Sequence, residues 1–229
     1  MKKSDYPLIT IDGPGATGKS TVAWEISKRL GIHFLNSGSL YRIAAYYAYE
    51  NIFSIEEVES IANQLNIDAL AFKSNDTDQD YAIFLNNKNI TNIIKQDSIA
   101  GLASRLSKED VLRRALVRKQ QDFYKQPGLV ADGRDMGSCI FPEAKYKFFL
   151  TASANIRAER RVKELQKQRI NANFTEVLDS LIKRDEQDAT RAIAPLVIPP
   201  GALVIDTSEL SFEEVVDKVL SHCCLNERC

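Results

Sequence analysis

The amino-acid sequence predicts an α/β fold: a doubly wound, five-stranded parallel sheet with a small antiparallel insert and a pair of charged helices in its second half. Three observations predict it. Short apolar runs alternate with helical patterns over most of the chain. A glycine-rich loop follows the first of these runs and opens a helix. A local meander of short strands then interrupts the alternation, which indicates an insert.

Five short apolar runs are expected to form the strands of the parallel sheet. A helical stripe that Gly31 ends separates the first two, so the chain opens as a strand–helix–strand unit with parallel strands. The insert falls between the second and third strands, and the charged helices fall between the fourth and fifth. The strands are Leu8–Asp12, Ile32–Leu35, Leu129–Ala131, Tyr146–Leu150 and Ala202–Ile205.

The loop after the first strand fits the phosphate-binding (P-loop) pattern G-x4-G-K-[ST]. Its glycines let backbone N–H groups converge on a phosphate, and the next helix presents its positive end there. Lys19 can reach the outer phosphates, and the Ser20 hydroxyl can bind Mg²⁺. The alternative is a glycine-rich turn with a chance Lys-Ser, but the flanking strand and helix accompany the motif. The expected nucleoside triphosphate site is Gly13, Pro14, Gly15, Ala16, Thr17, Gly18, Lys19, Ser20 and Thr21.

The insert begins after the second strand, where Asn36-Ser37-Gly38 is expected to turn into a helix over Ile43–Tyr49. A capping box at Ser54–Glu57 predicts another helix. An acidic loop follows the first strand of the meander; it lacks EF-hand spacing, so we expect a solvated loop and no calcium site. The meander is predicted as a small antiparallel sheet of Ile67–Lys73, Tyr81–Leu85 and Lys88–Thr91.

Charged residues gather at turns that follow strands, where open α/β sheets bind ligands. Asp132-Gly133-Arg134-Asp135 follows the third strand, and Arg42 is expected in the first turn of the helix after the second. A cation gains nothing from the dipole at a helix start, so an anionic partner for Arg42 is plausible. A salt-bridged loop and a solvated arginine are the alternatives at these two places.

Two arginine-rich helices joined by the polar link Asn171-Ala172-Asn173 are typical of a hinged lid over phosphates. Guanidinium groups pair bidentately with phosphate oxygens and stay charged. A triphosphate loop with many arginines around one cleft therefore predicts phosphoryl transfer between two anions. The charged residues of these helices are Arg157, Arg160, Arg161, Arg184, Asp185, Asp188 and Arg191.

Composition and charge argue against several other classes. The net charge of −1 argues against a sequence-independent nucleic-acid binder. No apolar run reaches the ~18 residues of a membrane span, and the first strand leaves no room for a signal peptide. We therefore expect a cytoplasmic protein, and a monomer, because no exposed apolar stripe is evident. Cys223, Cys224 and Cys229 beside His222 lack metal-site spacing and are expected to be reduced thiols of a tail.

Four segments together resemble the bacterial cytidylate kinases, a family of nucleoside monophosphate kinases. The similarity runs in order along nearly the whole chain, and the Asp-Gly-Arg-Asp-Met-Gly segment and the insert are specific to that family. The segments are Gly13–Thr21, Asn36–Arg42, Pro127–Gly137 and Arg184–Leu196. The chain departs from the family pattern at Asn36 (usually Asp), Ser20 (often Gly), and Gln187 and Lys95 (commonly Arg).

This resemblance implies transfer of the γ-phosphoryl group of ATP, with Mg²⁺, to CMP or dCMP, giving ADP and CDP or dCDP. It implies a monophosphate-binding insert at residues 37–105 and a lid at 157–183, with the core formed by 1–36, 106–156 and 184–229. The implied catalytic residues are Lys19, Asp132, Arg134, Arg157, Arg160 and Arg191.

The resemblance also implies which residues contact each substrate. The lid arginines Arg157, Arg160 and Arg161 approach ATP. The acceptor phosphate is held by Arg42, Arg134 and Arg191, with Ser37 and Arg184 in the same pocket; Ser104, Arg113 and Asp135 read the cytosine ring, and Asp188 contacts a sugar hydroxyl.

The base edge predicts a preference for cytosine over uracil. Cytosine offers an amino donor to a carboxylate, whereas uracil presents a carbonyl oxygen there. A buried unpaired acceptor costs about 1–3 kcal/mol, so CMP and dCMP should be preferred to UMP. The rival functions are a shikimate- or gluconate-type kinase, a GTPase-like switch and a non-catalytic nucleotide-binding module. Asn87-Lys88-Asn89-Ile90 does not supply the guanine motif Asn-Lys-x-Asp that a GTPase needs.

Overall fold

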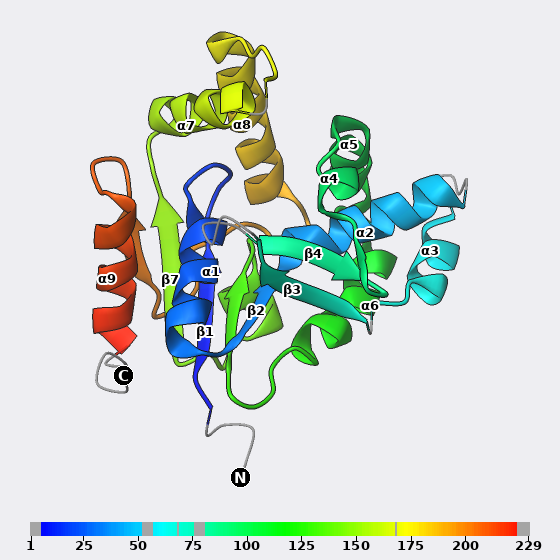
Figure 1. Cartoon of the computed structure of the whole chain (residues 1–229), viewed down its shortest axis with the longest axis horizontal. Helices are drawn as coiled ribbons and strands as arrows, with labels where there is room; N and C mark the ends of the chain where they lie inside the picture. Colours follow the sequence, from blue (N-terminus) through cyan, green and yellow to red (C-terminus); the bar gives the residue numbers. More distant parts are fainter. Residues whose placement is uncertain (1–5, 52–56, 68, 76–80, 168, 224–229) are drawn as a thin grey trace.

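The predicted strands form one parallel sheet in the computed structural model, which describes residues 6–51, 57–67, 69–75, 81–167 and 169–223 (Figure 1). The strand order is β2-β6-β1-β7-β8, with every pair parallel. Each strand end lies within one residue of its expected position. The predicted α/β fold is thus confirmed. The strands are β1 (Leu8–Asp12), β2 (His33–Asn36), β6 (Leu129–Asp132), β7 (Tyr146–Thr151) and β8 (Leu203–Asp206).

Helices cover both faces of this sheet, because successive strand residues point to opposite sides. Ile9 and Ile11 pack against one helical layer, and Leu8 and Leu129 pack against the other. The first layer contains α1 (Lys19–Leu30) and α9 (Phe212–Cys223). The second contains α2 (Ser37–Glu50), α3 (Val58–Gln64), α5 (Asp97–Leu106) and α6 (Asp110–Gln121).

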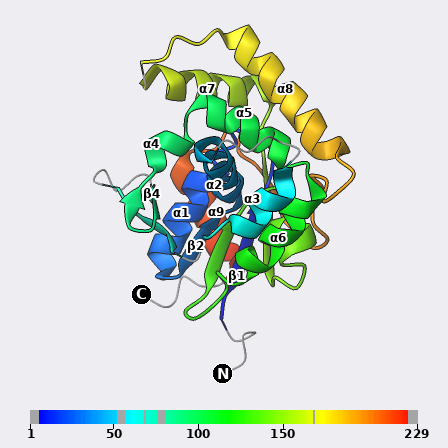
Figure 2. The same ribbon diagram turned by 90° about the vertical axis from the view of Figure 1, so that its right-hand side faces the viewer.

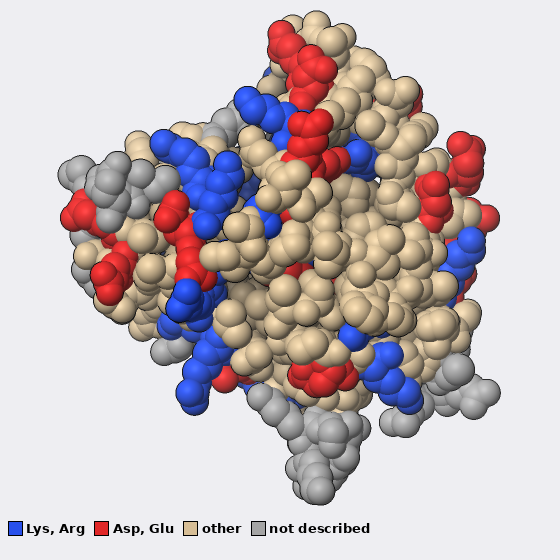
Figure 3. Space-filling model, turned by 180° about the vertical axis from the view of Figure 1, so that it is seen from behind, with Lys and Arg blue, Asp and Glu red and all other residues tan. Residues whose placement is uncertain are grey.

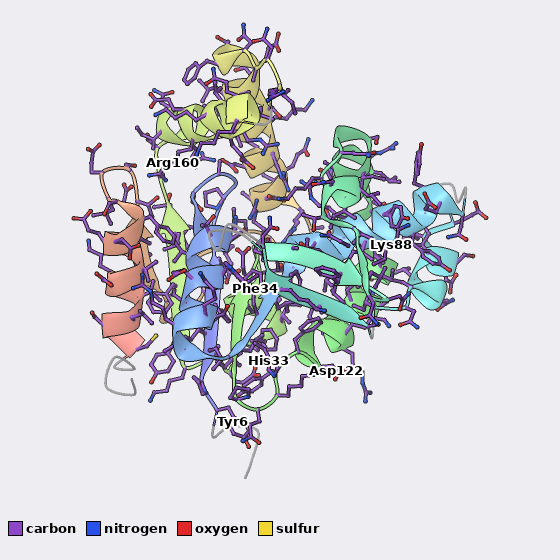
Figure 4. The ribbon with its side chains drawn as sticks, viewed as in Figure 1. Tyr6, His33, Phe34, Lys88, Asp122 and Arg160 are labelled. Carbon is purple, nitrogen blue, oxygen red and sulfur yellow. The ribbon has the colours of Figure 1, made fainter. Side chains whose placement is uncertain are left out.

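A second sheet packs beside the β2 edge and carries the order β3-β4-β5, antiparallel throughout. An aromatic cluster joins it to the core: Phe34 of β2, labelled in Figure 4, lies with its ring centroid 5.1 Å from Phe72 and 4.8 Å from Tyr81. Such aromatic pairs contribute about 0.5–1.5 kcal/mol each beyond burial. These contacts therefore hold the small sheet against the core. Its strands are β3 (Leu70–Ser74), β4 (Tyr81–Leu85) and β5 (Lys88–Asn89), and α4 (Thr91–Ile94) follows.

The two charged helices, α7 (Ala154–Lys167) and α8 (Phe174–Thr190), pack against each other beyond the carboxyl ends of the strands. Figures 1 and 2 show them above the rest of the molecule in both views. No residue of α8 is fully buried, and only Arg157 and Ala158 of α7 are. Contact with the core is therefore concentrated at the start of α7.

Three local expectations differ from the structure. Asn36-Ser37-Gly38 is not a turn before a helix: α2 begins at Ser37 because the Asn36 Oδ1 accepts the Ser39 N–H at 2.8 Å as N-cap. Arg42 consequently lies in the second turn of α2, not the first. The expected third strand of the meander ends early, since Thr91 begins α4. A π-helical turn that no periodicity predicted, η3 (Met136–Ile140), follows β6.

Three sequence features lie wholly or partly outside the described residues: the capping box at Ser54–Glu57, the acidic loop after β3, and the thiols of Cys224 and Cys229. Cys223 is not part of a tail, because it is the buried last residue of α9. Among the helices that are described, none is long and apolar enough to cross a lipid bilayer.

Seen from behind, charged side chains of both signs surround a broad area of uncharged residues (Figure 3).

Candidate active site

The loop between β1 and α1 holds backbone conformations that most side chains resist. Gly13 has a φ of 147°, and a Cβ there would lie 2.0 Å from the carbonyl oxygen of Leu150, so only glycine fits. Ala16 also adopts a left-handed conformation, with a φ of 60°, which is strained for alanine. This loop leads directly into the N-terminus of α1, whose N–H groups can bind an anion.

Lys19 is the first residue of α1 and is 7% exposed. Its ammonium group folds back over the loop and donates to the carbonyl oxygen of Pro14 at 3.1 Å. Burial, and then the nearby charge of Arg134, lower the pKa of Lys19 to about 7. A phosphate placed beside it would raise that pKa again, since an opposite charge favours the ammonium form. The side chain is therefore arranged to gain its charge when an anion binds.

Ser20, Asn36 and Asp132 meet at the other side of the loop. The Ser20 hydroxyl and the Asn36 amide both donate to Oδ2 of Asp132, each at 2.5 Å. Burial raises the pKa of Asp132, and the charge of Lys19 lowers it. Its other oxygen, Oδ1, is buried and has no hydrogen-bond partner among the described residues. Hydroxyl and carboxylate oxygens are ligands that Mg²⁺ prefers, so the residues present fit this cation.

A network of arginines and aspartates lies beside the loop. Asp135, immediately after the β6 turn, pairs with Arg113 of α6 and lies 3.5 Å from Nη2 of Arg191. Asp188 of α8 lies 3.0 Å from Nε of Arg134 and 3.8 Å from Nη1 of Arg191. Nη2 of Arg191 is buried and makes no hydrogen bond to any described residue. An anionic ligand that binds this nitrogen would replace its long contact with Asp135.

Arg134 connects this network to the loop. A Cβ built on Gly15 would lie 3.7 Å from its Nη2 and 3.4 Å from Leu181 of α8. Desolvation, with the charges of Arg134 and Arg42, lowers the pKa of Arg184, although that residue keeps surface open to solvent. Arg42 itself donates to the carbonyl oxygen of Ile94 at 2.8 Å. Several arginines from different elements therefore lie close together at one site.

Two of the three predicted lid arginines contact the loop. Arg157 donates to the carbonyl oxygen of Gly15 at 3.2 Å and pairs with Asp185 at 2.5 Å. Arg160, which extends from α7 toward the core in Figure 4, donates to the carbonyl oxygen of Thr17 at 3.4 Å. Arg161 instead pairs with Glu164 in the next turn of its own helix.

Of two further predicted acceptor residues, Ser37 contacts α6 and Ser104 lies on α5. The Ser37 hydroxyl donates to Oε1 of Gln120 at 2.7 Å. Ser104 is on α5, one turn before Ser107, whose carbonyl oxygen accepts from Arg113 at 2.8 Å. Sequence reasoning missed Gln120, which is 1% exposed, because a single glutamine in a helical pattern belongs to no motif.

Thr207 is a second residue that sequence reasoning missed. Its hydroxyl donates to the carbonyl oxygen of Thr17 at 3.3 Å, and its own carbonyl oxygen accepts from Arg160 at 2.5 Å. It follows β8 and reaches the loop only through the fold. In the sequence, only the position of Thr207 directly after a predicted strand could have indicated it, because ligand-binding turns follow the strands of such sheets.

The chain matches a family of known proteins over most of its length. The family model described as cytidylate kinase matches residues 9–224. A cytidylate kinase of Colwellia psychrerythraea is 41% identical over 214 residues, which cover 93% of this chain and 94% of that protein. Those of Haemophilus ducreyi (42% over 215 residues, 94% and 95%) and Nitrosomonas europaea (41% over 224 residues, 96% of each) are similar to the same extent. The similarity covers both the loop and the charged network.

Proposed function

The chain belongs to the cytidylate kinase family, an ATP-dependent class of nucleoside monophosphate kinases, and from that membership we propose that it phosphorylates CMP and dCMP at the site described above. The γ-phosphoryl group of ATP passes to the acceptor phosphate, giving CDP or dCDP and ADP. One observation carries this assignment of the site: Arg134 lies against the tip of the donor loop while it pairs with Asp188 of the charged network.

The donor half would hold ATP by its triphosphate. Backbone N–H groups of the loop and the ammonium of Lys19 would bind the β- and γ-phosphates. Ser20 and Asp132 would hold Mg²⁺, which when bound neutralises part of the phosphate charge. Arg157 and Arg160 donate to the loop carbonyls of Gly15 and Thr17, so both guanidinium groups lie at the loop that would hold the phosphates.

The acceptor half would orient CMP for in-line attack. Arg42, Arg134 and Arg191 would bind its phosphate, one oxygen of which attacks the γ-phosphorus as the bond to the bridging oxygen of ADP breaks. Arginines that bind the transferring group stabilise its spread charge, with effects of about 10³–10⁵ in rate. Arg113 and Asp135 would bind the base.

The acceptor half also has residues for the rest of the nucleotide. Asp188 would accept from a sugar hydroxyl, Ser37 and Arg184 would border the phosphate pocket, and Ser104 would contact the base. The insert at 37–105 and the lid at 157–183 would close over the two substrates, with Arg161 nearer the solvent side of the lid.

An ADP-release assay with CMP, dCMP, UMP, AMP and shikimate tests the proposal. CMP and dCMP should be turned over with the highest kcat/KM, and removal of Mg²⁺ should abolish turnover. A higher kcat/KM for shikimate or AMP, or no ADP release with any acceptor, would reject it. The monomeric state and cytoplasmic location stay predictions; sedimentation at assay concentration tests the first.

A further inference from the structure

Asp12 is a buried carboxylate that the mechanism above does not use. It is the last residue of β1, directly before Gly13 of the donor loop, and is 0% exposed. Its two oxygens accept from two successive backbone N–H groups: Oδ1 from Met136 and Oδ2 from Gly137, both at 2.8 Å. The charge of Asp12 is thus met by amides of a distant segment.

Those amides belong to the segment that carries Asp135. Met136 follows Asp135 directly, and Asp135 pairs with Arg113 in the acceptor network. At the other end of the same turn, the N–H of Gly133 donates to the carbonyl oxygen of Ile11 at 3.1 Å. The last two residues of β1 therefore hold the turn on both sides of Asp135.

The turn has little room to shift on this support. A Cβ built on Gly137 would lie 2.7 Å from Oγ1 of Thr10, so the backbone at this residue lies directly on β1. Two hydrogen bonds to one carboxylate fix the rotation of the two peptide planes as well as their position, which one bond does not.

We propose that Asp12 is a positioning residue that holds Asp135 in the orientation needed to bind cytosine, in register with the donor loop that begins at Gly13. The inference rests on the proposed function, since it assigns Asp12 to the same site. Asp12 then lies at the junction of the two halves. The donor loop follows it in the sequence, and the turn that carries Asp135 is hydrogen-bonded to its carboxylate.

A cap for η3 alone would not require this charge. A neutral Asn, Ser or Thr accepts from a backbone N–H without the desolvation of a carboxylate. Burial raises the pKa of Asp12 to about 7, against the two N–H bonds that lower it, and the charges of Asp135 and Asp132 raise it further. The structure therefore holds a carboxylate where a neutral cap would be less costly, which favours a role beyond capping.

Asp12→Asn tests this role because it keeps the size and one acceptor while turning an NH₂ group toward an N–H. We expect KM and Kd for CMP to rise at least about tenfold and the preference for CMP over UMP to fall, because a lost charged hydrogen bond changes binding by this order. KM for ATP should change by less than about twofold, since the donor loop contacts are untouched. Asp12→Ser, a smaller neutral acceptor, should show the same pattern.

Val219→Ala is the matched control, because Val219 is a 0% exposed residue of α9 in the other helical layer. It should lower Tm and leave both KM values unchanged. Equal losses for CMP and ATP in the Asp12 variants, or an unchanged preference for CMP, would overturn the proposal. Variants that no longer bind an ATP analogue would also reject it, in favour of a folding role. Failure of the wild-type protein to phosphorylate CMP would instead refute the proposed function.

Discussion

The donor and acceptor halves of the site are built in different ways. The donor loop is one continuous segment, and the side chains around it bond mainly to its backbone carbonyl oxygens: Lys19 donates to Pro14, and Arg157 of α7 donates to Gly15. The acceptor half consists of side-chain ion pairs between distant parts of the chain, such as Arg113 with Asp135. The conformation of the loop is specified locally, whereas the network exists only once three regions, namely α6, the turn after β6 and the end of α8, have folded together.

The halves also differ in how their cations are balanced. Lys19 faces a neutral carbonyl and has a lowered pKa, so it gains from an incoming phosphate. Arg134 and Arg191 are already paired with Asp188, so an acceptor phosphate must rearrange existing pairs. Substitutions in the donor half should therefore change rate and ATP binding, and those in the acceptor half should change acceptor affinity and base preference.

Arg134→Met should have the largest effect, because Arg134 is the side chain that joins the two halves. We expect kcat to fall by about 10³ or more, as for other arginines that bind a transferring phosphoryl group. Steady-state kinetics with both substrates varied measures it. Arg114→Met, an exposed arginine of α6 paired with Asp110, should change kcat less than about twofold by comparison. A decrease in kcat of less than tenfold in Arg134→Met would contradict the claim that this side chain joins the two halves.

Lys19→Met should lower kcat by about 10²–10³, the range seen when one preorganised donor is removed from developing charge. The Kd for CMP should stay within about twofold, because Lys19 belongs to the donor half alone. Calorimetric titration of the variant with CMP measures this. An equal loss of CMP affinity would show that the two halves are not distinct.

Arg160→Ala should lower kcat by about tenfold or more and change ATP affinity less, if the lid acts on the transition state. Arg160 bonds to Thr17 of the donor loop, whereas Arg161 pairs with Glu164. Arg161→Ala should therefore lose less activity. An unchanged kcat in Arg160→Ala, measured at saturating ATP, would argue against a transition-state role for the lid.

The smallest expected effect is a proton taken up when ATP binds at pH 8. With a pKa of about 7, Lys19 is mostly neutral at this pH in the free protein, and the triphosphate favours its charged form. Binding should therefore take up a proton in part, and Lys19→Met should not. Calorimetric titration in two buffers of different ionisation enthalpy gives the number of protons taken up. Equal uptake by the wild-type protein and Lys19→Met would show that a group other than Lys19 takes up the proton.

The sequence predicted most of the fold and the donor half because both depend on local patterns. The strands were short apolar runs, and the loop was one motif. The start of α2 was misplaced because Asn36 serves as a cap, a role that its position before Ser-Gly did not reveal. The partners of Arg113 and Arg191 could not be predicted from spacing, since Asp135 reaches them only through tertiary packing.

The buried residues that contact the site residues were harder still to predict. In the sequence, Asp12 is only the end of a predicted strand, and Gln120 is only one residue of a helical pattern. Their roles depend on the amides and hydroxyl that the fold brings to them, 124 residues away for Met136 and 83 for Ser37. Family resemblance supplied the expected contacts of the acceptor half, but the geometry supplied these partners.

The most direct test of the central claim, that the acceptor half reads cytosine through Asp135, is the ratio of kcat/KM for CMP to that for UMP, in wild-type protein and in Asp135→Ala. We predict a wild-type ratio of about 5–150, which corresponds to one buried unpaired acceptor of about 1–3 kcal/mol. In Asp135→Ala the ratio should fall toward 1. A wild-type ratio near 1, or an undiminished ratio in the variant, would contradict the account.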